Sequence, residues 1–120
     1  MNSLQSSINT IICLALLGCA HAVAPVAKLT IPQTEAECTA RGGDWTTLGL
    51  PMPDKPKMCD LKATDSGKSC RDSSECQGIC IPPATLNVGA HAIGTCSVYI
   101  ANFGNVRRVT DGVVEELNVE

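Results

Sequence analysis

The sequence predicts a small disulfide-rich α+β or mainly β domain with one short N-terminal helix, short strands and a C-terminal β-hairpin. Three observations support this fold class. The chain has eight cysteines in 120 residues, it has just one Trp, one Tyr and one Phe, and it begins with a segment typical of exported proteins. A domain of this size with so little bulky apolar surface needs covalent cross-links to remain folded.

The N-terminal segment has the features of a secretory signal peptide. A polar start precedes an apolar run over Ile8–Leu17. This run is shorter than the roughly 20 apolar residues that a membrane-spanning helix needs. Small residues follow, and Ala20-His21-Ala22 fits the rule for signal peptidase cleavage, which would remove residues 1–22.

A second processing site competes with the first. The tetrapeptide Leu16–Cys19 is similar to the lipobox of bacterial lipoproteins, in which residues 1–18 would be removed and Cys19 would become acylated. The sequence leaves both alternatives open. We therefore expect an exported protein, periplasmic or extracellular. It would contact a bacterial membrane only in the lipoprotein alternative, through a lipid on Cys19.

Either kind of processing leaves six cysteines for the mature domain, which we expect to form three disulfides in an oxidising compartment. They are Cys38, Cys59, Cys70, Cys76, Cys80 and Cys96. Six cysteines can pair in fifteen ways. We favour Cys38–Cys59, Cys70–Cys80 and Cys76–Cys96, because these pairs close the helix onto the second strand and join the central segment to the strand of Cys96.

The first part of the mature chain divides into a leader and a helix. Residues 23–32 have two prolines and no periodicity, so we expect a flexible or extended leader before a disulfide-stapled domain over residues 33–120. A helix is predicted over Glu35–Arg41. Thr34 and Glu37 have the spacing of a capping box, and Gly42-Gly43 ends the helix.

The remaining segments read as short strands separated by loops. The predicted strands are Gly43–Leu50, Lys57–Leu61, Ile79–Ile81 and Gly94–Ile100. Two long polar loops, Pro51–Lys57 and Pro82–Ile93, lie between them and begin with prolines that fix φ. We also expect Asp72 to cap a single helical turn that reaches Cys76.

The strongest hairpin signal lies near the C-terminus. Val106–Thr110 and Val113–Leu117 flank Asp111-Gly112, and a two-residue Asp-Gly connection is typical of a type I′ turn because both residues need positive φ. Two arginines in the first arm, Arg107 and Arg108, are expected to pair with Glu115 and Glu116 in the second, at a few tenths of a kcal/mol for each pair.

We expect no catalytic, cofactor or metal site. Zinc sites use cysteines two to four residues apart with a second pair or histidines, and they need reduced thiolates, whereas an exported chain keeps disulfides. His91 is the single histidine left after cleavage behind Ala22, and no motif places a Ser, Asp or Glu beside it.

The spacing of cysteines and glycines resembles a set of small exported cysteine-rich proteins of proteobacteria. The pattern is C-x3-GG-x-W from Cys38, followed by D-x-GK-x-C-x5-C-x-G-x-C from Asp65 to Cys80. The last three cysteines of the pattern also resemble, over about a dozen residues, those of colipase and prokineticin. The main resemblance implies an envelope or extracellular location and no enzymatic role, and it implies no substrate.

These observations predict a non-enzymatic secreted or cell-envelope protein that acts as a binding or structural module for a protein partner. The alternative is an inhibitor of an exported hydrolase that presents a loop from its disulfide scaffold, since preorganisation lowers the entropic cost of binding. A net charge of −3 argues against a nucleic-acid partner, which would select a basic face.

Overall fold

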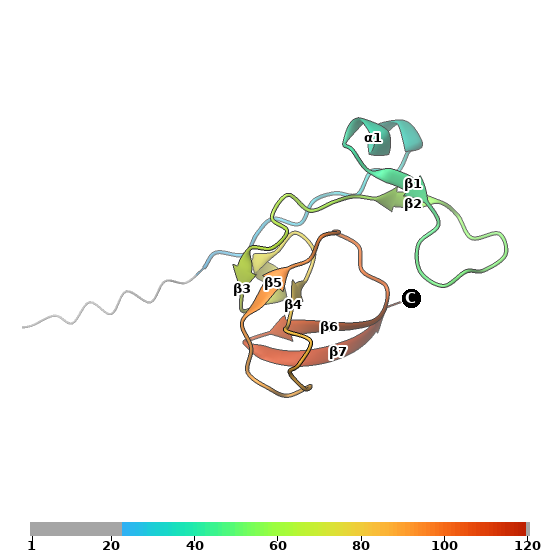
Figure 1. Ribbon diagram of the computed structural model, residues 1–120. Coiled ribbons are helices and arrows are strands. Elements are labelled where there is room, and N and C mark those ends of the chain that lie inside the picture. Colours follow the sequence, from blue (N-terminus) through green and yellow to red (C-terminus); the bar gives the residue numbers. More distant parts are fainter. Residues whose placement is uncertain (1–22, 120) are drawn as a thin grey trace, which may run out of the picture.

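The computed structural model describes residues 23–119. The predicted signal peptide, its two processing sites and Cys19 therefore lie outside the described residues. The described chain forms one α-helix, one 3₁₀ helix and seven short strands, joined by three disulfides (Figure 1). All strand pairs are antiparallel. The predicted small disulfide-rich fold of mixed helix and mainly β structure is confirmed.

The N-terminal lobe consists of α1 (Glu35–Ala40), β1 (Asp44–Thr46) and β2 (Met58–Asp60). Thr34 Oγ1 accepts a hydrogen bond from the Glu37 N–H, as a helix N-cap does. The reciprocal bond of the capping box, in which the Thr34 N–H would donate to the Glu37 carboxylate, is not formed among the described residues. The helix ends where Gly42 takes a positive φ of 75°.

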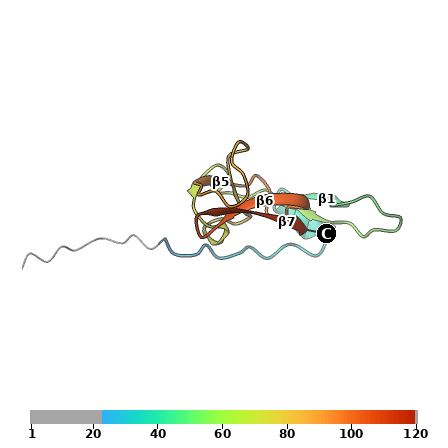
Figure 2. The same cartoon turned by 90° about the horizontal axis from the view of Figure 1, so that it is seen from below.

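The first strand pair is shorter than the sequence predicts. We expected strands over Gly43–Leu50 and Lys57–Leu61, but pairing stops at Thr46↔Met58. Pro56, which has no N–H to donate, lies two residues before the start of β2 at Met58. The eleven residues 47–57 therefore form a loop (the β1–β2 loop) that projects beyond the lobe (Figures 1 and 2).

The C-terminal lobe is built around a small three-stranded sheet in the order β3 (Ser69–Cys70), β5 (Gly94–Cys96), β4 (Cys80–Ile81). The 3₁₀ helix η1 (Ser73–Glu75) precedes β4, and Asp72 caps it as predicted. The predicted strand Gly94–Ile100 stops at Cys96, because residues 98–100 pair with residues 61–63 instead.

The hairpin β6 (Gly104–Thr110) and β7 (Val113–Val119) is longer than predicted and has the expected turn. Asp111 and Gly112 have φ values of 50° and 74°. Arg108 is ion-paired with Glu115 across the strands as expected.

The second expected pair, between Arg107 and Glu116, is not formed. Arg107 points to the face of the hairpin opposite to that of Arg108. Its guanidinium donates to the Ala84 carbonyl at 3.3 Å instead of pairing with Glu116. On this face Val109 and Val114 are buried, and Val109 packs against the four cysteines of the lobe.

Disulfides take the place of large apolar side chains in both lobes. The bonds are Cys38–Cys59, Cys70–Cys80 and Cys76–Cys96, the pairs that the sequence analysis favoured. The N-terminal core is Cys38, Cys59 and Leu61 with Trp45 packed against it, and the C-terminal core is the other four cysteines with Val109. Each bridge contributes about 2–4 kcal/mol to stability.

The segment expected to be a leader, residues 23–32, is extended and bonded to the domain. The Val26 N–H donates to the Ser74 carbonyl, and the Lys28 ammonium donates to the carbonyls of Ser73, Cys76 and Gly78 at 3.0, 2.7 and 2.7 Å. Figures 1 and 2 show that the segment runs from the end of the molecule near β3 to α1. It therefore links the two lobes.

Close packing explains one of the glycines in the sequence. A Cβ on Gly78 would lie 2.2 Å from Ser97 Oγ and 2.5 Å from the Tyr99 carbonyl. Ser97 is buried, accepts from the Ile79 N–H and donates to that carbonyl, so it has no free direction in which to move.

We expect Gly78→Ala to lower the free energy of unfolding by about 2–3 kcal/mol, because the added methyl group overpacks this contact. Gly67→Ala is the matched control. Gly67 has a φ of 82° with open space around it, so the control should lose about 1 kcal/mol from backbone strain alone. Urea titration with the disulfides intact measures both losses, and equal losses would contradict the packing argument.

The carboxylate of Asp72 joins two elements that lie far apart in the sequence. One oxygen accepts from the Ser74 N–H and the other from the Asp111 N–H, both at 2.7 Å. The bond from the Asp111 N–H, followed by those from Ser74, lowers the pKa of Asp72. A lowered carboxyl pKa stabilises the fold above the pKa of the unfolded chain, and this stability is lost as the pH falls through the folded pKa.

We expect Asp72→Asn to cost about 1 kcal/mol at neutral pH, and the difference from the wild type to shrink in acid. Urea titrations at several pH values measure it. Asp44→Asn is the control of opposite sign, because Asp44 faces Asp60 across β1 and β2. Burial, and then Asp44, raise the pKa of Asp60. Removing Asp44 should therefore maintain or raise stability at neutral pH. A loss that did not depend on pH for Asp72→Asn would contradict the role of its charge.

Candidate binding surface

The β1–β2 loop carries the most exposed large apolar side chains of the described chain. Leu50 is 70% exposed and Met52 is 66% exposed. Both precede a proline, Pro51 or Pro53, and a residue before proline is held in an extended conformation. The loop is also braced from within, since Lys55 Nζ donates to the Leu50 carbonyl at 3.1 Å. These two side chains are therefore presented to solvent by a stiffened backbone.

A groove of about 780 Å³ lies between this loop and the open end of the β6–β7 hairpin. Its lining is mixed, with aliphatic side chains from both elements and amides from the hairpin. The lining residues are Leu50, Met52, Lys55, Gly104, Asn105, Asn118 and Val119. A groove of this size and composition suits part of a peptide chain.

The edge of β7 next to this groove has backbone groups that point away from β6. Val114 shows the direction, because its N–H donates to the Ala90 carbonyl and its carbonyl accepts from the Gly89 N–H. Glu116 and Asn118 follow at the strand period of two, so their N–H and C=O groups point the same way. Within residues 23–119, no hydrogen bond engages these four groups.

The second long loop, residues 82–93, is hydrogen-bonded to the hairpin over its last residues. Its last residues cover the first half of the β7 edge through the bonds of Gly89 and Ala90 and a bridge between His91 and Val113. Val88 remains 58% exposed at its tip. Val88 lines neither of the two small pockets beside this loop.

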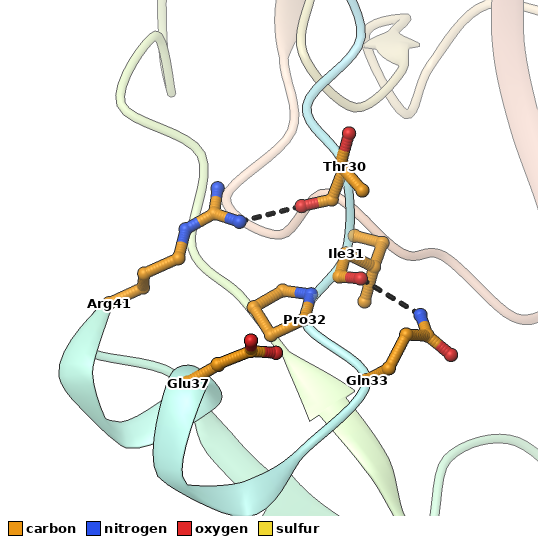
Figure 3. A pocket seen from close by; sticks show the side chains of 6 residues that line it. All are labelled: Thr30, Ile31, Pro32, Gln33, Glu37 and Arg41. Atoms are coloured by element: carbon orange, nitrogen blue, oxygen red, sulfur yellow. Dashed lines mark hydrogen bonds between the residues drawn. The ribbon is translucent and has the colours of Figure 1, made fainter.

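A shallow pocket of about 370 Å³ lies where the leader meets α1 (Figure 3). Arg41 Nη1 donates to the Thr30 carbonyl at 2.6 Å, and Gln33 Nε2 donates to the Ile31 carbonyl at 2.8 Å. In Figure 3, Glu37 lies beside Pro32 at its floor. The side chains of Arg41 and Gln33 are thus engaged by backbone carbonyls of the leader.

The residues that bear reactive groups are not brought together. His91 lies exposed in a small pocket with Arg71, Ala92, Ile93 and Gly112, where no carboxylate or hydroxyl group joins it. The six predicted disulfide cysteines are all bonded, so none offers a free thiolate. No sequence pattern predicts the groove, because Leu50 and Asn118 are far apart in the chain and no local signal connects them.

Comparisons with known proteins add no identity to this arrangement. No family model matches the chain, and no curated protein or solved structure is similar to it.

The ammonium of Lys28 is the main attachment of the leader to the C-terminal lobe. Burial lowers the pKa of Lys28, and the nearby carboxylates of Asp65 and Asp72 oppose this effect. Three carbonyls converge on its Nζ, and hydrogen bonds to a charged donor are stronger than neutral ones.

We expect Lys28→Met to release the leader while the domain stays folded. Loss of about 2 kcal/mol of charge-assisted hydrogen bonding should speed exchange of the Val26 amide proton roughly 30-fold. Hydrogen exchange followed by NMR measures this change. Lys68→Met is the control, because Lys68 is exposed and its Nζ has no hydrogen bond among residues 23–119. Unchanged protection at Val26 in Lys28→Met would contradict the attachment.

Proposed function

We propose that this protein is a non-enzymatic exported binding module that takes an extended segment of a partner protein. The segment pairs with the free half of the β7 edge, at Glu116 and Asn118, and places an apolar side chain in the groove beside Leu50 and Met52. The single observation that carries the proposal is the position of this groove, next to backbone groups that point into solvent.

The physical basis is preorganisation. Main-chain hydrogen bonds along a sheet edge supply affinity, and a pocket for an alternate side chain supplies selectivity. The disulfides and the prolines hold both elements before the partner arrives, so binding orders few groups. Proteins normally cover or disrupt an unpaired strand edge, because it can pair with another chain. The free half of the β7 edge is therefore a place where a partner strand can bind.

The three disulfides indicate an oxidising setting, extracellular or periplasmic. Neither helix of residues 23–119 has the length and apolarity needed to cross a membrane. Within this setting we propose export by the N-terminal signal, with release after Ala22 or a lipid on Cys19 as the two processing alternatives. The partner is then a protein of the cell envelope or the medium.

Inhibition of an exported hydrolase is the second candidate function. The feature that favours it is that Leu50 and Met52 are the two most exposed large apolar side chains and each is followed by proline. Such a loop is extended and stiff, as a segment inserted into a catalytic cleft must be. In that case the loop itself, rather than the β7 edge, would be the bound element.

Site-specific photo-cross-linking distinguishes these functions and tests both. A photoreactive residue replaces Met52 in one sample and Val88, exposed on the other loop, in the control. We expect one envelope or medium protein to be cross-linked from position 52 and not from position 88. Equal labelling from both positions, or from neither, would contradict the proposed surface.

Two variants then assign the contact. Asn118→Pro removes an edge N–H that β6 does not use, and proline is tolerated at sheet edges. It should weaken capture at least about 10-fold in the strand-pairing mode, which is about 1.4 kcal/mol. Leu50→Ser/Met52→Ser should weaken capture in both modes. Capture that survives Asn118→Pro but fails in the double variant would favour the inhibitor, whose partner should then lose hydrolytic activity when bound.

A further inference from the structure

The two disulfides of the C-terminal lobe lie against each other. Three of their sulfur atoms, from Cys70, Cys76 and Cys96, lie within 4.8 Å of one another. The fourth sulfur, from Cys80, is bonded to that of Cys70 at 2.02 Å. All four residues are buried, with at most 3% of their surface exposed. All four cysteines therefore belong to one buried core of the lobe, in which Cys80 reaches the other three sulfurs through its bond to Cys70.

We propose that the reduced form of this domain binds one soft metal ion, Zn²⁺ or an ion of similar chemistry, through the four thiolates of Cys70, Cys76, Cys80 and Cys96. A tetrahedral zinc site with Zn–S bonds of about 2.3 Å sets its sulfurs about 3.8 Å apart. In the oxidised domain the three clustered sulfurs lie within 4.8 Å of one another. Reduction of the two bridges frees the bonded sulfurs to separate to the spacing of such a site.

The backbone already places the four cysteines around one point. They come from β3, from the C-cap of η1, from β4 and from β5, and β5 is hydrogen-bonded to both β3 and β4. The Cα atoms of the bridged pairs are 5.9 and 5.4 Å apart. Gly94 lies against Cys80, since a Cβ there would be 2.9 Å from Cys80 Sγ. The four cysteine side chains therefore converge in one buried core from neighbouring segments of the lobe.

The chemistry balances with a phosphine as the reductant. Each disulfide takes two electrons and two protons from one phosphine and one water, which yields two thiols and one phosphine oxide. Two bridges thus give four thiols, and the metal ion displaces their four protons when four thiolates bind it. Thiolates are soft ligands, which selects zinc or a similar ion over magnesium or calcium.

Metal binding is linked to folding. Without metal the four cysteines of the reduced lobe are neutral thiols, and the two cross-links that held its centre are gone. A bound ion coordinates the four thiolates and so replaces these cross-links, and its binding free energy becomes folding free energy. The third bridge, Cys38–Cys59, lies in the other core and takes no part.

The test uses the full mature chain, residues 23–120, reduced with a phosphine and titrated with Co²⁺ as a spectroscopic probe. We expect one Co²⁺ per chain, the visible absorption of a tetrahedral thiolate site, and displacement of the probe by Zn²⁺. Hydrogen exchange supplies a second readout. The amides of the β6–β7 hairpin, which packs on the sulfur cluster through Val109, should be protected when metal is present and unprotected in the reduced chain without it.

Matched variants separate this site from unspecific binding by reduced cysteines. Cys38→Ser/Cys59→Ser should keep the absorption and the affinity, whereas Cys76→Ser should weaken Co²⁺ binding at least about 10-fold. The proposal is overturned if the double variant loses the site, if Cys76→Ser binds as well as the wild type, or if Co²⁺ binds while the hairpin stays unprotected.

Discussion

The contact between two adjacent disulfides and Val109 is the interaction on which the C-terminal lobe depends. The strands of its sheet have two or three residues each, and the hairpin beside it has two strands. Neither sheet is long enough to be stable alone. The sulfur cluster holds both, because it ties β3, β4 and β5 together and offers the hairpin a buried surface. Covalent bonds here replace the aromatic side chains that the sequence lacks.

Around this centre, single polar groups join segments that are distant in the chain. Asp72 binds the amides of Ser74 and Asp111, and Lys28 binds three carbonyls of residues 73–78. Each group satisfies backbone atoms that short strands and loops leave unpaired. The domain therefore depends on a few side chains with several bonds each, where a larger protein would rely on long ladders.

The sequence predicts well those features that arise from local chemistry. Thr34 caps α1, and Asp111-Gly112 forms the turn of the hairpin, because each needs a few neighbouring residues. It predicts poorly what depends on distant partners. The Lys28 clamp spans 45 to 50 positions, and the groove joins Leu50 to Asn118. The predicted strand ends are wrong for the same reason. Pairing stops at Thr46↔Met58, and Pro56 lies just before the opposite strand. No pattern within one segment of the sequence predicts contacts between residues that are so far apart in the chain.

The path of residues 23–32 has a consequence for how the molecule is oriented. The described chain begins at the end near β3, and the β1–β2 loop projects from the opposite end (Figures 1 and 2). Lys28 fixes the segment between them to the C-terminal lobe. A force applied at Val23 is therefore transmitted to this lobe through the Lys28 hydrogen bonds. Any body that held the protein by the segment before Lys28 would carry the β1–β2 loop at the far end of the molecule (Figures 1 and 2).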